Sequence, residues 1–206
     1  MQLRGCGTAL VTPFRQDGSL DEPALTNLVN WQIESGIDFL VPCGTTGETP
    51  TLSHDEWLRV IDLTIEAAAG RVPIVAGATS NSTHDAVAKA KEVADRPGVD
   101  AILTASPYYN KPTQEGQYQH FRAIAEAVPR PVVIYNIPGR TASNITPASL
   151  PPYSSGYLRP RKWSSPNRRK SSRGNSPFSS HSRAWGLSSL STTARTVARK
   201  ASCSSE

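Results

Sequence analysis

The sequence predicts a parallel α/β domain over residues 1–150, followed by a basic tail over residues 151–206. Two observations support this division. In the first part, short apolar runs alternate with amphipathic helical patterns, one unit about every 30 residues. After residue 150 the alternation stops, and serine and basic residues dominate.

Five stretches have the composition of buried strands, because each is a short run rich in β-branched or other apolar residues. They lie at residues 8–12, 39–42, 73–76, 101–104 and 132–135. The runs are continuous rather than alternating with polar residues, which is typical of parallel strands that are covered on both faces.

The four intervals between these strands carry apolar residues at helical spacing. The apolar faces are Leu25, Leu28, Val29 and Ile33; Leu58, Ile61, Ile65 and Ala68; Ala86, Ala90, Val93 and Ala94; and Phe121, Ile124, Ala125 and Val128. Ser53 followed by Glu56 predicts a capping box before the second helix. Both a doubly wound sheet and a (β/α)₈ barrel fit this alternation. No glycine-rich nucleotide fingerprint follows the first strand, and a full barrel needs about 250 residues.

Charge and cysteine usage narrow the class of protein. Residues 1–150 hold 11 Lys/Arg against 16 Asp/Glu, a net charge of −5. No apolar run approaches the ~20 residues of a membrane span, and residues 1–5 lack the apolar segment of a secretory signal. The cysteines form no C-x-x-C pair and the histidines no ligand spacing. We therefore expect a cytoplasmic protein with reduced thiols, no metal and no cofactor.

The tail holds 16 serines and 11 Lys/Arg against a single acidic residue, Glu206, for a net charge of +10. Such a composition buries too little apolar surface to offset chain entropy, so the tail is predicted to be disordered. Two origins remain open. Out-of-frame translation of a GC-rich gene is favoured over a genuine basic tail, which would bind nucleic acid through residues 168–170 beside Trp163 and Trp185.

Candidate chemistry lies where three predicted strands end. Thr45 and Thr46, flanked by glycines, form a turn whose N–H groups suit a carboxylate. Residues 106–112 carry two adjacent tyrosines. Tyr135 ends the fifth strand, and the proline and glycine at 138 and 139 are expected to break the strand and leave Arg140 on the loop beyond. A phenol near a guanidinium is a plausible proton donor beside an anion clamp.

The order of these segments resembles the dihydrodipicolinate synthase (4-hydroxy-tetrahydrodipicolinate synthase) family of class I pyruvate-dependent aldolases. The matching segments are GTALVTPF (7–14), GTTGE (44–48), PYYNKP (107–112) and YNIPGRT (135–141). The resemblance covers residues 3–150 and implies a (β/α)₈ TIM barrel, of which this chain holds about the first five units. The family forms homotetramers and condenses pyruvate with aspartate semialdehyde through a Schiff base in lysine biosynthesis by the diaminopimelate pathway.

The resemblance also implies roles for individual residues. Tyr135 resembles the proton donor and acceptor, with Thr45 and Tyr109 as the other members of its relay, Tyr109 being lent by a neighbouring subunit. Thr46 would hold the pyruvate carboxylate. Arg140 would pair with the carboxylate of the aldehyde, where a planar two-pronged donor fits two oxygens. A sialic acid lyase or keto-deoxy-sugar lyase binds a polyhydroxylated chain instead, so Arg140 favours the synthase.

A second group of residues matches the family's lysine-binding regulatory site at the subunit interface. The group is Thr49, His54, Asn81, Asp85 and Tyr108. Trp57 stands where some feedback-inhibited members carry histidine.

The nucleophilic lysine of the Schiff base is not identified. Lys162 lies at about the right distance, but Pro160 and Arg161 precede it and no apolar run surrounds it. We therefore expect the chain as written to be inactive. Five parallel strands also cannot close a barrel, so unpaired edges are expected on the first and fifth strands, where they invite aggregation.

Overall fold

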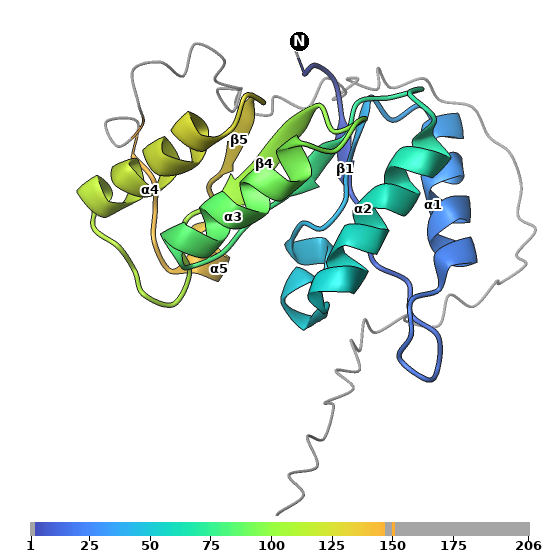
Figure 1. Cartoon of the computed structure of the whole chain (residues 1–206), viewed down its shortest axis with the longest axis horizontal. Coiled ribbons are helices and arrows are strands. Elements are labelled where there is room, and N and C mark those ends of the chain that lie inside the picture. The colour runs from blue at the N-terminus through green and yellow to red at the C-terminus, as the bar shows by residue number, and fades with distance from the viewer. Residues whose placement is uncertain (1–2, 147–149, 151–206) are drawn as a thin grey trace, which may run out of the picture. The chain divides into compact units, whose positions relative to one another are not determined.

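Strands and helices alternate along the part of the chain that the computed structural model describes, residues 3–146 and 150 (Figure 1). The elements are β1 (Gly7–Ala9), α1 (Glu22–Glu34), β2 (Phe39–Val41), the 3₁₀ turns η1 (Thr45–Gly47) and η2 (Thr49–Thr51), α2 (His54–Ala68), β3 (Val75–Gly77), α3 (Thr83–Ala94), β4 (Ala101–Ala105), α4 (Gln114–Ala127), β5 (Val132–Tyr135) and α5 (Pro138–Thr141). The predicted tail lies outside the described residues.

The strands are parallel and follow one another in chain order. β1 pairs with β2, and β4 pairs with both β3 and β5. A parallel bridge between Leu40 and Ile74 joins β2 to β3, and the N–H of Gly77 donates to the carbonyl of Pro42 at 3.0 Å. Among the described residues, β1 and β5 each pair on one side only. The predicted parallel α/β fold is therefore confirmed, as an open series of five strands.

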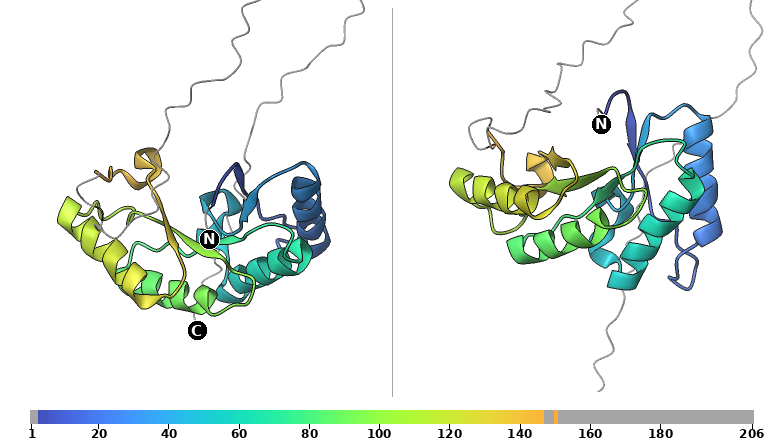
Figure 2. Two further views of the ribbon diagram at one scale, coloured as in Figure 1. Left: turned by 90° about the horizontal axis from the view of Figure 1, so that it is seen from above. Right: turned by 45° about the horizontal axis from the view of Figure 1, so that its top comes forward.

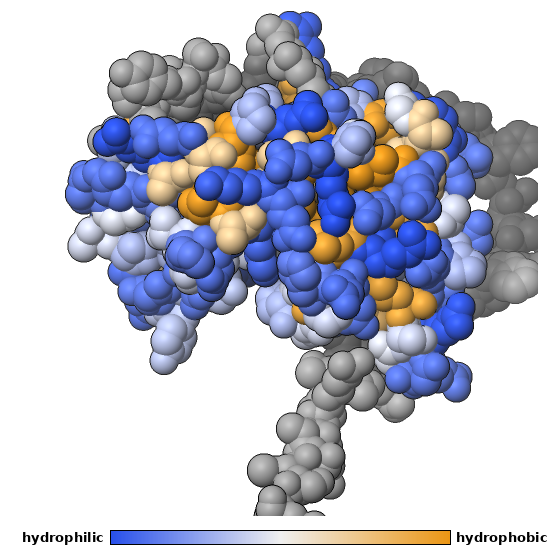
Figure 3. Space-filling view, in the orientation of Figure 1, coloured by the Kyte–Doolittle hydropathy of each residue, from blue (hydrophilic) through white to orange (hydrophobic). Residues whose placement is uncertain are grey.

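The helices α1 to α4 lie along one face of these strands (Figures 1 and 2). The main core fills the space between, with Leu40, Ala76 and Ile102 contributed by the strands. Alternate residues point to the other face, where Val41, Val75 and Ala101 form a second, smaller cluster. Both faces of the strands are thus apolar, which explains the continuous apolar runs. The view onto the helices is mostly hydrophilic, with apolar patches between them (Figure 3).

All four long helices begin at a residue whose side chain caps the helix. At α2 the Glu56 N–H donates to Ser53 Oγ at 3.3 Å, and the Ser53 N–H donates to Glu56 Oε2 at 2.8 Å, which completes the expected capping box. Side chains of Asp21, Ser82 and Thr113 cap α1, α3 and α4. The apolar faces predicted for α1, α2 and α3 pack on the core. In α4 the predicted Phe121, Ile124 and Val128 are buried, but Ala125 is exposed and Ala127 packs on the core instead, so this part of the prediction was wrong.

Two other local predictions were wrong. The first strand was placed at residues 8–12, but β1 ends at Ala9, although the N–H of Leu10 still donates to the Val41 carbonyl at 3.0 Å. Arg140 was placed on a loop, but it lies in the short helix α5, which Pro138 begins. Proline is tolerated at the first position of a helix, because the N–H that it lacks has no partner there.

Gly77, the last residue of β3, lies against the backbone of Cys43. A Cβ atom at position 77 would lie 1.9 Å from the Cys43 carbonyl oxygen. That carbonyl accepts a hydrogen bond from Thr49 Oγ1 at 2.7 Å, and the Gly77 carbonyl accepts one from Trp57 Nε1 at 3.1 Å. Hydrogen bonds therefore hold the backbone at both Cys43 and Gly77, so these two segments cannot easily move apart.

We expect Gly77→Ala to destabilise the protein by about 3 kcal/mol or more, at the upper end of overpacking costs, because the new methyl group meets backbone atoms. Urea unfolding followed by circular dichroism measures the change. Gly139→Ala is the matched control, since no atom lies within 4 Å of the added group. Equal stability of the two variants would contradict the steric argument.

Several polar side chains are buried between the end of β4 and α4. The side chains of Ser106 and Gln117 are fully buried and joined by a 2.9 Å hydrogen bond from Ser106 Oγ to Gln117 Oε1. One turn further along the helix, His120 is 1% exposed, and its Nδ1 lies 2.9 Å from Thr83 Oγ1. Burial lowers the pKa of His120 to about 4, because the charged imidazolium is poorly solvated there.

The stability of the fold should therefore fall on mild acidification. Between the unfolded pKa near 6.5 and the folded value, the unfolded chain binds more protons, so the free energy of unfolding decreases as the pH falls. We expect His120 alone to cost about 2 kcal/mol between pH 7 and pH 5. Urea unfolding at pH 7 and pH 5 measures this decrease in the free energy of unfolding. The variant His120→Gln should lack the decrease, and the control His84→Gln should keep it. An identical pH dependence in all three proteins would refute the assignment to His120.

Candidate active site

Three loops follow the C-terminal ends of β2, β4 and β5. Because the strands are parallel and neighbouring, their C-terminal ends lie along one edge of the sheet. In the last pair of the β4–β5 ladder, Ala105 lies opposite Tyr135, so the loop that starts at Ser106 begins beside Tyr135. This is the edge at which (β/α)₈ barrels place their catalytic residues.

The threonine loop, residues 44–48, follows β2. Thr45 and Thr46 lie in η1, and both are exposed. Within the loop the Gly47 N–H donates to the Gly44 carbonyl at 3.0 Å, and the Glu48 N–H donates to the Thr45 carbonyl at 3.3 Å. These two N–H groups are engaged inside the turn. The expected carboxylate donors are therefore limited to the earlier N–H groups of the loop and the two hydroxyls.

Two threonine hydroxyls, one buried and one half-buried, bind backbone carbonyls in and next to the threonine loop. Thr12 is 5% exposed, and its Oγ1 donates to the Gly47 carbonyl at 2.7 Å. Thr49 Oγ1 lies 2.7 Å from the Cys43 carbonyl and 2.9 Å from the Gly44 carbonyl. Cys43 itself adopts a left-handed conformation, with φ of 56°. Thr49, expected at a regulatory site, thus also has a local structural contact.

The tyrosine loop, residues 106–112, follows β4. Tyr109 is 89% exposed and has a φ of 74°, a left-handed conformation that directs the chain through a sharp turn. Tyr108 is half-buried. Asn110 Nδ2 donates to the Asn81 carbonyl at 3.0 Å, which ties the loop to the segment after β3.

Tyr135 and Arg140 belong to the segment that follows β5. Tyr135 is 38% exposed at the strand end, and Arg140 is exposed on α5. Between them Asn136 binds the returning chain: its Oδ1 accepts from the Ile145 N–H at 3.2 Å, and its Nδ2 donates to Asn144 Oδ1 at 2.9 Å.

The structure brings the expected relay residues to one edge without joining them. In the described part of the chain, no hydrogen bond connects the hydroxyls of Thr45, Tyr109 and Tyr135. Two strands, β3 and β4, separate the strand of Thr45 from that of Tyr135.

The five residues expected at a regulatory site fall into two places. His54, at the start of α2, pairs with Glu92 at 3.1 Å, while Thr49 lies in η2. Asn81, Tyr108 and Asp85 lie near the start of α3 and the tyrosine loop. Asn110 connects two of them, because its N–H donates to the Tyr108 carbonyl at 3.0 Å and its amide to Asn81.

The described lysines do not offer a Schiff-base nucleophile on a strand. Lys89 and Lys91 lie on α3, and Lys89 Nζ is 5.4 Å from the centre of the Trp57 ring. Lys111 lies in the tyrosine loop. Lys162 lies outside the described residues. Across residues 3–146, no group of three or more metal-ligating side chains is found, and no helix is long and apolar enough to cross a membrane.

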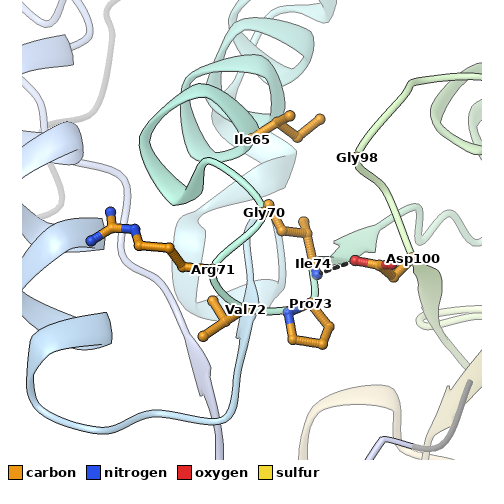
Figure 4. A pocket seen from close by; sticks show the side chains of 8 residues that line it. All are labelled: Ile65, Gly70, Arg71, Val72, Pro73, Ile74, Gly98 and Asp100. Atoms are coloured by element: carbon orange, nitrogen blue, oxygen red, sulfur yellow. Dashed lines mark hydrogen bonds between the residues drawn. The ribbon is translucent and has the colours of Figure 1, made fainter.

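A pocket of about 240 Å³ lies at the opposite ends of the strands (Figure 4). It is formed by the chain entering β3 and β4, including Arg71, Ile74 and Asp100. Its polar groups are already paired: Asp100 Oδ2 accepts from the Ile74 N–H at 2.9 Å, and Arg71 donates to the carbonyls of Ala67 and Ala68. The three loops, rather than this pocket, are the better candidate site.

Sequence reasoning missed several residues that hold these loops. Thr12 and Asn136 lie within the segments GTALVTPF and YNIPGRT, which carry the family resemblance, and that was the available signal. Gly77, Gln114 and Gln117 lie outside the quoted segments, and no local pattern distinguishes them.

Comparison with known proteins gives a consistent result. The dihydrodipicolinate synthetase family matches residues 2–151. A 4-hydroxy-tetrahydrodipicolinate synthase of Koribacter versatilis is 77% identical over 150 residues, which are 73% of this chain and 50% of the relative. This chain therefore spans about half the length of the curated relatives that it matches.

Solved structures agree. The 4-hydroxy-tetrahydrodipicolinate synthase of Methylacidiphilum fumariolicum SolV matches with a TM-score of 0.69 and 44% identity, over 72% of this chain and 49% of that one. The dihydrodipicolinate synthase of Acinetobacter baumannii, complexed with pyruvate, matches with a TM-score of 0.68 and 48% identity, over 70% and 50%. The described strands are thus the first five of the family's barrel, and the chain belongs to the dihydrodipicolinate synthetase family.

Proposed function

We propose that residues 1–150 form the partial barrel that carries the substrate-binding and proton-transfer groups of a 4-hydroxy-tetrahydrodipicolinate synthase, a cytoplasmic enzyme that condenses pyruvate with aspartate semialdehyde. One observation carries the proposal. The residues expected to do this chemistry lie in three loops at one edge of the sheet, in a chain 77% identical to a relative of that name. The pyruvate complex of the Acinetobacter baumannii structure supports the same substrate class.

Tyr135 is the proposed proton donor and acceptor. An ordinary phenol loses its proton near pH 10, so it works near neutrality only where neighbouring hydroxyls share and orient the proton. Thr45 and Tyr109 are proposed to complete this relay. Since Tyr109 is 89% exposed, its side chain is available to a neighbouring subunit of the family's homotetramer rather than to its own sheet.

Thr46 and Arg140 are the proposed carboxylate anchors. Thr46 offers a hydroxyl at the end of β2, beside loop N–H groups, which suits the carboxylate of pyruvate. Arg140 presents an exposed guanidinium from α5, two residues beyond Pro138. A bidentate pair with the carboxylate of aspartate semialdehyde would fix that substrate's orientation. A polyhydroxylated sugar acid would not require this charge.

The Schiff base needs an amine that the described strands do not supply. We therefore propose that the chain holds half of the site, and that activity requires the later strands of the barrel. Lys89 and Lys91 lie on a helix, so they are not alternatives.

Borohydride trapping tests this on the full chain. We expect incubation with pyruvate and borohydride to leave the mass of the protein unchanged, because no lysine of the described residues lies on a strand at the site edge. A covalent adduct located at Lys162 by peptide mapping would show that residues 151–206 complete the site. The Koribacter versatilis relative is the positive control for the reaction conditions.

The roles can be tested in a chimera of residues 1–150 with the C-terminal half of the Koribacter versatilis relative. Tyr135→Phe should lower kcat by about 10²–10⁴, the range of general acid–base catalysis. Arg140→Ala should mainly raise the KM for aspartate semialdehyde, since it removes binding common to ground and transition states. Steady-state kinetics separate the two effects.

Two variants on the outer helix α4 serve as controls: Tyr118→Phe for the phenol, and Arg122→Ala, which breaks an ion pair with Glu126, for the guanidinium. Both should leave the kinetics unchanged. Turnover of a sugar acid in preference to the semialdehyde would overturn the proposed function.

A further inference from the structure

The first turn of α4 reaches two of the three candidate loops. Its N-cap, Thr113, follows the tyrosine loop directly, and Thr113 Oγ1 accepts from the Gly116 N–H at 3.1 Å. Two glutamines of this turn, Gln114 and Gln117, point their amides in different directions. Gln117 binds the base of the tyrosine loop, and Gln114 binds the chain that returns after α5.

The contact of Gln117 is fully buried. Ser106, the first residue of the tyrosine loop, donates from Oγ to Gln117 Oε1 at 2.9 Å, and neither side chain is exposed. In this interior a polar atom that loses its partner has no water to replace it. The hydrogen bond therefore fixes where the loop leaves β4 relative to α4.

The contacts of Gln114 reach the other segment. Its Nε2 donates to the Asn144 carbonyl at 2.8 Å, and its Oε1 accepts from both the N–H and the Oγ1 of Thr146 at 3.1 Å. Asn144 is in turn bound through its Oδ1 to Asn136, the neighbour of Tyr135. A continuous chain of hydrogen bonds thus runs from α4 to the residue that follows the proposed proton donor.

These contacts extend beyond the backbone ladder. The pairing of β4 with β5 ends at Ala105 and Tyr135, so the two loops leave the sheet without further shared strand hydrogen bonds. Gln114 joins residues 30 and 32 positions away, across that gap. Both amides belong to one helical turn, so a single element contacts both segments.

We infer that Gln114 and Gln117 are positioning residues, which lock the tyrosine loop and the segment from Tyr135 to Thr146 into one relative geometry. A displacement of one segment therefore changes the position of the other. The catalytic meaning of this coupling rests on the proposed function, because only that function makes Tyr109 and Tyr135 partners in one relay. The coupling itself is a property of the fold.

The test uses the full chain labelled with 3-fluorotyrosine, with the fluorine resonances of Tyr109 and Tyr135 assigned by single Tyr→Phe variants. Gln114→Leu should shift the resonance of Tyr135, whose segment Gln114 binds, and also the resonance of Tyr109 in the tyrosine loop. Amide exchange of Thr146, whose N–H donates to Gln114 Oε1, should accelerate about fivefold, the effect of losing that one hydrogen bond.

Gln119→Leu is the matched control, because Gln119 lies on the same helix and, among the described residues, bonds to Glu115 of that helix at 2.7 Å rather than to either loop. Gln117→Leu should move the Tyr109 resonance, and Gln117→Glu in its neutral, protonated form should leave it in place, since the carboxyl oxygen can still accept from Ser106. If Gln117→Leu fails to fold, the exposed Gln114→Leu variant still decides the question.

Resonances and exchange rates of Gln114→Leu that match those of Gln119→Leu would overturn the coupling. A shift confined to Tyr135 would overturn it as well, since it would show that the two loops move independently. None of these readouts depends on turnover. Failure of the coupling is therefore distinguishable from failure of the proposed enzyme activity, which the chimera kinetics measure.

Discussion

The contact between Gly77 and the Cys43 carbonyl sets the geometry on which the rest of the site edge depends. β2 and β3 share little backbone pairing, so this close contact between the end of β3 and the residue after β2 helps to fix their relative position. Only glycine permits this approach, and Cys43 itself adopts the left-handed conformation at the start of the threonine loop. Thr49 and Trp57 donate to the carbonyls of Cys43 and Gly77, the two residues of this contact.

In all three loops, the side chains that hold the backbone differ from those proposed to contact the substrate. The groups that shape the backbone are uncharged hydroxyls and amides that hold carbonyls and N–H groups, among them Thr12, Asn136 and Gln114. The groups proposed to meet substrate, such as Tyr135 and Arg140, remain exposed at the rim. Loops held in this way can present reactive groups in fixed positions, because the ordering cost is met by contacts that take no part in the chemistry.

The sequence predicted what is encoded locally and missed what depends on distant segments. Helix α2 was predicted with its capping box, because Ser53 and Glu56 are close in sequence and their bonds form within one turn. The bounds of β5 were predicted as observed, since a β-branched run ends where Pro138 follows. By contrast, the structure around Arg140 depended on whether Pro138 begins a loop or a helix. The fixed φ of proline is compatible with both. Gly77 could not be singled out, because the carbonyl that excludes a side chain there lies 34 residues earlier.

The order of the strands has a consequence for how such a chain acquires its structure during synthesis. Every strand pair described here joins neighbours along the sequence, with β3 to β4 and β4 to β5 separated by about 30 residues. Less loop-closure entropy opposes these pairs than would oppose pairs of strands that lie further apart in the sequence. Each unit can therefore dock on the one before it as the polypeptide leaves the ribosome, ahead of any later strand. The edge of β1 is the exception, since in a closed barrel its second neighbour is the last strand to be made.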